Sequence, residues 1–162
     1  GYGTAIFYGD FVKLVAAGTV EKAAVTTAVV AGTVGIFVGC SYTDPSTNQL
    51  TFNQQFPAST AASDIMAYVV DDPKLVFKMQ GDEAIAQTGL GNNVSAVNTA
   101  GSTTIGRSRN ALDGGSIATT NTLPLRILEF VDGPDSTVGD AFTDCLVTYL
   151  PLSHAYETKL GV

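Results

Sequence analysis

Short apolar runs rich in β-branched residues recur along this chain, and each ends at a turn made by Gly, Asp or Pro. Runs of this kind are typical of strands rather than long helices. Only the segment 82–87, with an acidic start and Gly89 just beyond it, favours a helix of one to two turns. The expected strands lie at residues 4–8, 11–15, 18–20, 34–40, 50–52, 65–70, 75–79, 123–131 and 145–150.

Turn signals predict how some of these strands connect. Residues 12–14 and 18–20 flank a Gly-containing turn and are expected to form a hairpin. A second hairpin is expected where residues 65–70 and 75–79 flank the turn Asp-Asp-Pro-Lys. Glycines inside the run 34–40 indicate bulges, barrel corners or a close approach of backbone.

The remaining chain completes the expected fold. Residues 98–121 are rich in Gly, Ser, Thr and Asn, which predicts a long, ordered surface loop with short strand pieces; disorder of part of it is the alternative. The whole pattern predicts a mainly β fold, an antiparallel barrel or sandwich with one short helix. The length favours a single β domain over residues 1–162.

Composition narrows the classes of partner. The chain is 45% hydrophobic, which excludes disorder of the whole chain. The formal net charge is −7, and because such a field repels phosphate no nucleic-acid partner is expected. The longest apolar stretch, residues 25–40, is too short and too rich in Gly and Thr to span a bilayer as a helix, so no membrane partner is expected. Because the numbering starts at Gly1 and not at Met, an N-terminal arm is expected upstream.

The residues that could carry catalysis give no convincing constellation. Cys40 and Cys145 lie in apolar surroundings without a CxxC partner, so buried thiols are favoured over a disulfide. Ser153 precedes His154 directly, and neighbours on an extended chain point to opposite faces, so a structural or solvent-facing histidine is favoured over a catalytic pair. The acidic residues at 71–72 and 132–144 fit turns better than a calcium loop. No catalytic residue, cofactor or metal is therefore expected.

Binding to another protein is easier to place in the sequence. Arg107 and Arg109 form a dense basic spot in an acidic chain, and they could meet Asp113 or a partner's carboxylates. Most of the 8 Phe and 6 Tyr are expected in the core, while some anchor an interface.

Several strings resemble a family of tailed-phage virion proteins, found especially in marine phages and known as capsid decoration or head proteins. The resemblance spans roughly residues 4–130. It rests on Ile-Phe-Tyr-Gly-Asp at 6–10, Gly-Ile-Phe-Val-Gly-Cys-Ser-Tyr at 35–42, Phe-Asn-Gln-Gln-Phe-Pro-Ala at 52–58, Ala-Tyr-Val-Val-Asp-Asp-Pro at 67–73, Val-Phe-Lys-Met-Gln at 76–80, Gly-Arg-Ser at 106–108 and Leu-Pro-Leu-Arg-Ile-Leu at 123–128.

The resemblance implies a cement protein that binds the outer face of an icosahedral phage head and bridges neighbouring capsid subunits. Its partners would be the major capsid protein and further copies of itself, as a homotrimer or a dimer, in a virion assembled in the host cytoplasm. Residues 1–4 would lead in from an arm lying on the capsid, which makes Tyr2 and Thr4 interface candidates together with Arg107 and Arg109.

Two other classes stay open. The first is a subunit of another self-assembling structure, such as a tail, a fibre or a pilus, where donor-strand exchange would need an unpaired groove. The second is a small-ligand-binding protein or an enzyme that uses Cys145, His154 and nearby carboxylates.

Overall fold

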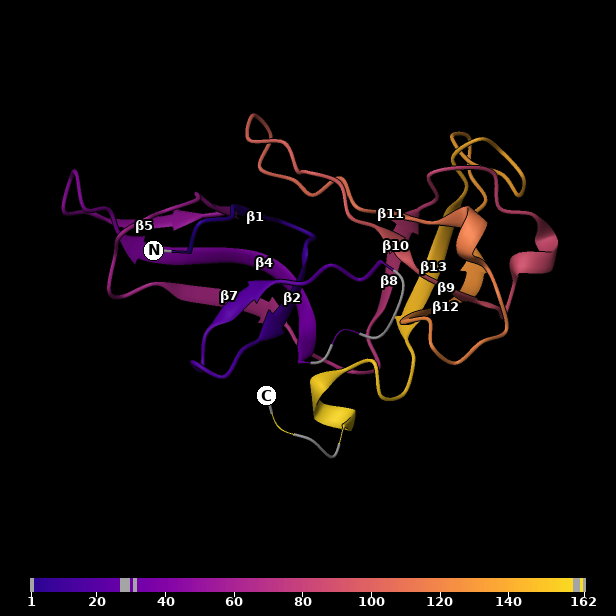
Figure 1. Cartoon of the computed structure of the whole chain (residues 1–162). Coiled ribbons are helices and arrows are strands. Elements are labelled where there is room, and N and C mark those ends of the chain that lie inside the picture. The colour runs from indigo at the N-terminus through magenta and orange to yellow at the C-terminus, as the bar shows by residue number, and fades with distance from the viewer. Residues whose placement is uncertain (1, 27–29, 31, 159–160, 162) are drawn as a thin grey trace.

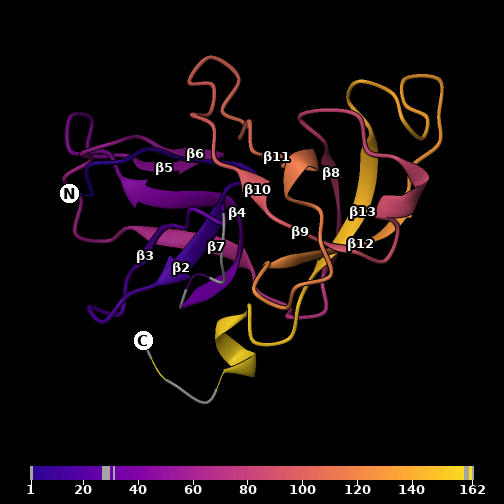
Figure 2. The same ribbon diagram turned by 45° about the vertical axis from the view of Figure 1, so that its right-hand side comes forward.

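Two antiparallel sheets lie side by side in the computed structural model, which describes residues 2–26, 30, 32–158 and 161 (Figures 1 and 2). The first sheet has the order β3-β2-β4-β5, and β7 pairs with the other edge of β4. Its strands are β2 (Phe11–Leu14), β3 (Val20–Lys22), β4 (Thr33–Thr43), β5 (Leu50–Asn53) and β7 (Met66–Val70).

The second sheet has the order β8-β13-β12-β9. Its strands are β8 (Val76–Gln80), β9 (Asn93–Val94), β12 (Leu125–Phe130) and β13 (Asp144–Tyr149). Two short ladders join β1 (Ile6–Phe7) to β6 (Gln55–Phe56) and β10 (Ala96–Val97) to β11 (Ala111–Leu112). The helical turns are the 3₁₀ segments η1 (Gln87–Gly89), η2 (Gly114–Ser116) and η3 (Ala155–Glu157).

One hydrophobic core joins the two sheets. Phe11 of the first sheet contacts Phe77 and Tyr149 of the second, with ring centroids 5.9 and 6.1 Å apart. A second core lies on the opposite face of the first sheet, where Phe37 and Cys40 pack beneath Ile6. The mainly β, antiparallel, sandwich-like fold predicted from the sequence is therefore confirmed.

The hairpin predicted for residues 12–20 is confirmed, and here the turn and both of its strands belong to one sheet. The β2–β3 hairpin forms with Leu14 opposite Val20. The glycines of β4 mark irregular pairing as predicted: the register shifts beside Gly35 and next to Gly39. Both have positive φ, +149° and +147°. Residues 98–121 form a surface loop that contains β11, η2 and few other regular elements, and its first half projects from the molecule at the top of both views (Figures 1 and 2).

Of the two architectures that the sequence left open, the described strands form the sandwich-like one and close no barrel: the first sheet ends in β3, β5 and β7, and the second in β8 and β9. Two predictions were wrong. The segment 82–87 forms no helix, because Asp82 N–H bonds to Leu112 O and Ile85 N–H to Thr143 Oγ1. These bonds tie the segment to β11 and to the residue before β13, and they hold Ile85 in the core between the sheets.

The expected hairpin of residues 65–70 and 75–79 is the second error. β7 pairs with β4 and β8 pairs with β13, so the turn between them crosses from one sheet to the other. The turn itself has the predicted chemistry, since Asp72 Oδ1 accepts a bond from Lys74 N–H at 2.8 Å. Local turn chemistry therefore fixed the bend but not the partner of either strand.

Candidate interaction surfaces

A row of exposed apolar side chains lies on β5 and β7, on the face of the first sheet opposite its second core. Ser41 of β4 lies between Phe52 and Met66 in the register, which places these side chains in one row. Phe52 is 70% exposed and Met66 62%. We call this surface the outer face; it consists of Leu50, Phe52, Met66, Tyr68 and Val70.

Hydrogen bonds fix the middle of the outer face. Tyr68 Oη lies 2.9 Å from Ser41 Oγ, which holds the tyrosine ring across β4. At the end of β4, Asp64 accepts bonds from both the hydroxyl and the backbone N–H of Thr43. These bonds lower the pKa of Asp64, so its carboxylate stays charged beside the apolar row. The outer face is thus an ordered apolar surface with an acidic margin.

A pocket of about 500 Å³ opens into the second core on the other face of the same sheet. Phe37 and Cys40 of β4 line it, together with Val20 of β3 and Ala67 of β7. Tyr2 also lines this pocket and packs on Phe56 with ring centroids 6.5 Å apart. Its hydroxyl accepts a bond from Lys22 N–H at 3.2 Å.

The four interface candidates of the sequence do not form one surface. Thr4 is exposed near Tyr2. Arg107 and Arg109 are exposed on the projecting loop, where the backbone of Arg107 forms an isolated β-bridge with that of Tyr8. No ion pair joins either arginine to Asp113 among the described residues. Gly1, part of the expected lead-in from an arm, lies outside the described residues. The role of these residues in an interface stays a prediction.

His154 is a structural residue. Its side chain is fully buried, and Nε2 lies 2.9 Å from Val34 O while Nδ1 accepts from Tyr156 N–H. A carbonyl can only accept, so the proton sits on Nε2 and both ring nitrogens are occupied. The buried hydroxyl of Ser153 has no hydrogen-bond partner in the described part of the chain and makes no bond to this ring. The structural alternative for this histidine is therefore confirmed.

Both cysteines are free and buried, as predicted. Burial raises the pKa of Cys40 and of Cys145 to about 11, and the neighbouring Asp144 carboxylate adds to the effect on Cys145. At pH 8 only about one thiol in a thousand is then ionised, and the thiolate is the reactive form.

We therefore expect iodoacetamide to alkylate the native protein at least a hundredfold more slowly than the protein in 8 M urea. The reaction is followed at pH 8 by mass spectrometry. A native-state rate close to that of the unfolded chain would show an activated thiol and contradict the structural role of both cysteines.

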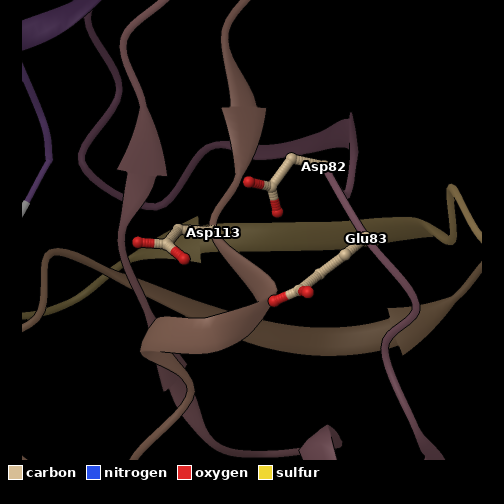
Figure 3. A group of neighbouring side chains, drawn as sticks. All are labelled: Asp82, Glu83 and Asp113. Atoms are coloured by element: carbon tan, nitrogen blue, oxygen red, sulfur yellow. The ribbon is translucent and has the colours of Figure 1, made fainter.

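Three acidic side chains gather beside η2. One carboxylate oxygen from each of Asp82, Glu83 and Asp113 lies within 4.8 Å of the others (Figure 3). Asp82 accepts a bond from Gly114 N–H, and Asp113 accepts one from Ser95 Oγ. The sequence did not point to this group because Asp113 is far from the other two along the chain. Exposed carboxylates gather without an ion as well, so the expectation of no metal stays a prediction.

Among the described residues no helix is long and apolar enough to cross a membrane. Comparison of the chain with protein-family models, with characterised proteins and with solved structures finds no match.

Proposed function

We propose that this chain is a structural virion protein that decorates the outer face of a tailed-phage head and stabilises the shell. The outer face carries the proposal, since it presents five large apolar side chains on one ordered sheet surface. Contiguous apolar patches of this kind mark protein–protein contacts. The resemblance of the strings between residues 4 and 130 to capsid decoration proteins supports the choice of partner.

The geometry suits a clamp better than a catalyst. Phe52 and Met66 are held in a row by strand pairing, and burying each against a partner stabilises the contact by about 1.5–3 kcal/mol. A protein that binds only the assembled shell stabilises it by mass action. If the chain forms a trimer, three such contacts act together through their high effective concentration. The negative net charge limits adhesion to DNA released from broken heads.

A charge on the outer face should weaken this binding. We expect Phe52→Asp to lower occupancy at least tenfold on heads assembled from the major capsid protein of the phage that carries this chain, since about 1.4 kcal/mol corresponds to tenfold. Occupancy is measured by co-sedimentation and by electron microscopy of the particles. Folding should be unchanged because Phe52 is exposed in the free chain.

The matched control is Phe142→Asp, which makes the same change at an exposed phenylalanine before β13. It should bind like the unchanged protein. If Phe52→Asp and the unchanged chain occupied heads equally, the outer face would not be the surface that contacts the head. Failure of the unchanged chain to bind heads at all would overturn the proposed function, and an open polymer in size-exclusion chromatography would favour a fibre subunit instead.

A further inference from the structure

We propose that the pocket between β3 and β7 binds an extended segment of a partner polypeptide, which adds a strand to the first sheet. The segment has alternating apolar residues and Lys or Arg at its ends. The pocket lies on the sheet face opposite the outer face and shares only Met66 of β7 with it. The proposal holds whether or not the partner belongs to a capsid.

The two sides of the pocket are the two edges of one curved part of the sheet. The pairings run β3-β2-β4-β7, since β2 and β7 both pair with Ile36 of β4. Val20 and Glu21 of β3 line one side of the pocket, and Met66 and Ala67 of β7 line the other. Neither β3 nor β7 has a second strand partner in the part of the chain that the structure describes. The sheet thus curves around a gap with unpaired strand edges on both sides.

The backbone of β3 is ready to pair with a further strand. Val15 N–H donates to Thr19 O and Ala23 N–H donates to Phe11 O, so residues 19 and 23 face β2. Alternation along a strand then directs the backbone groups of Val20 and Lys22 away from β2. The outward N–H of Lys22 donates to the Tyr2 hydroxyl, so a side-chain oxygen occupies the position that a carbonyl of a neighbouring strand would take. Unpaired edges of this kind are normally covered or blocked by charge, and they bind extended peptides by strand addition.

The interior of the pocket selects apolar side chains. Phe37 and Cys40 belong to the core below it, and Ile6, Phe56 and Ile65 complete the lining. A volume of about 500 Å³ lies in the range of pockets that bury most of a small ligand. An acyl chain would fill this space but would leave both strand edges unpaired, whereas a strand satisfies the edges and fills the interior with alternate residues.

Charge sets the ends of the bound segment. Glu21 of β3 lines the pocket, and Asp71 and Asp72 follow β7 at the end of the other edge, in a chain of net charge −7. Basic residues at the ends of the incoming strand complement these carboxylates. Pairing of β7 with β7 of a second copy would place the carboxylates of both chains near one another, which disfavours that occupant.

The test uses the full chain and a fluorescently labelled synthetic peptide, Lys-Val-Thr-Val-Thr-Val-Lys. We expect saturable binding in fluorescence anisotropy and slower amide hydrogen exchange in β3 and β7. Methylation of alternate peptide nitrogens keeps the side chains and removes strand pairing, so it should weaken binding at least tenfold. A peptide with Glu at both ends should also bind at least tenfold more weakly.

A variant pair tests the β3 edge directly. Val20→Pro removes an outward N–H that makes no bond to β2 and should weaken peptide binding at least tenfold relative to Val20→Ala, which keeps this N–H. If Val20→Pro does not fold, the methylated peptide and the hydrogen-exchange data on the unchanged chain test the strand pairing instead. No binding, binding insensitive to methylation, or no protection of β3 and β7 would overturn the proposal. Binding of oleate without binding of the peptide would also overturn the proposal. Self-association that slows amide hydrogen exchange in β3 and β7 would do the same. None of these measurements involves heads, so their failure is distinct from failure of the Phe52→Asp experiment.

Discussion

Replacing Gly35 with alanine is expected to lower the free energy of unfolding by about 4 kcal/mol or more. Gly35 has a φ of +149°, a conformation that L side chains rarely adopt. A Cβ atom there would lie 2.1 Å from Val70 O, and this oxygen belongs to the backbone of β7. The backbone cannot move away without breaking the pairing of β7 with β4, so the clash and the conformational strain add.

Urea unfolding followed by circular dichroism measures this effect. Gly133→Ala is the matched control, because no atom lies within 4 Å of an added Cβ there and its φ is outside the positive range. The control should change the unfolding free energy by less than about 1 kcal/mol. If Gly35→Ala proved as mild as the control, the close approach of β4 and β7 would be wrong.

The second large effect is expected at Asp10. This carboxylate is fully buried and accepts bonds from Phe7 N–H and Ser108 Oγ at 2.9 and 2.6 Å. Lys22 Nζ lies 3.1 Å away and is itself mostly buried. Removing one partner of a buried ion pair leaves the other charge without compensation, and this costs about 3–5 kcal/mol. We therefore expect Asp10→Ala to destabilise the fold by this amount.

A double variant separates the ion pair from the packing around it. Asp10→Asn combined with Lys22→Met removes both charges and should be more stable than Asp10→Asn alone, because no buried charge is left unpaired. Lys78→Met is the comparison, since the Lys78 side chain is 55% exposed where it meets Asp144 and water screens this pair more than the Asp10–Lys22 pair. Its loss should therefore cost less stability, and equal losses for the two pairs in thermal unfolding would contradict this account.

Much of the fold could be predicted because its signals are local. The run at 34–40, with its two glycines, specified a bulged central strand, and the turn before Val20 specified a hairpin. The partners of β7 and β8 could not be predicted in the same way. Both flank a good turn, yet the apolar side chains of Val69 and Phe77 belong to different cores, and only the complete set of strands decides that.

The candidate surfaces were harder to predict for the same reason. The alternation of Leu50, Thr51 and Phe52 shows that this strand has two unlike faces, but it does not show that the more apolar face is exposed. The pocket depends on which edges stay unpaired, and this follows from the sheet order. Arg107 and Arg109 were recognisable because isolated basic residues in an acidic chain stand out without knowledge of the fold.

The bonds to Asp10 also bear on the order of events during synthesis. Ser108 and Asn110 lie 98 and 100 residues after the aspartate that they contact. Phe7 and Lys22 can bind this carboxylate early, but its remaining hydrogen bonds cannot form until residues 108–110 have left the ribosome. Contacts of such long range slow folding, so the N-terminal sheet is expected to stay incompletely stabilised in fragments that end before residue 108.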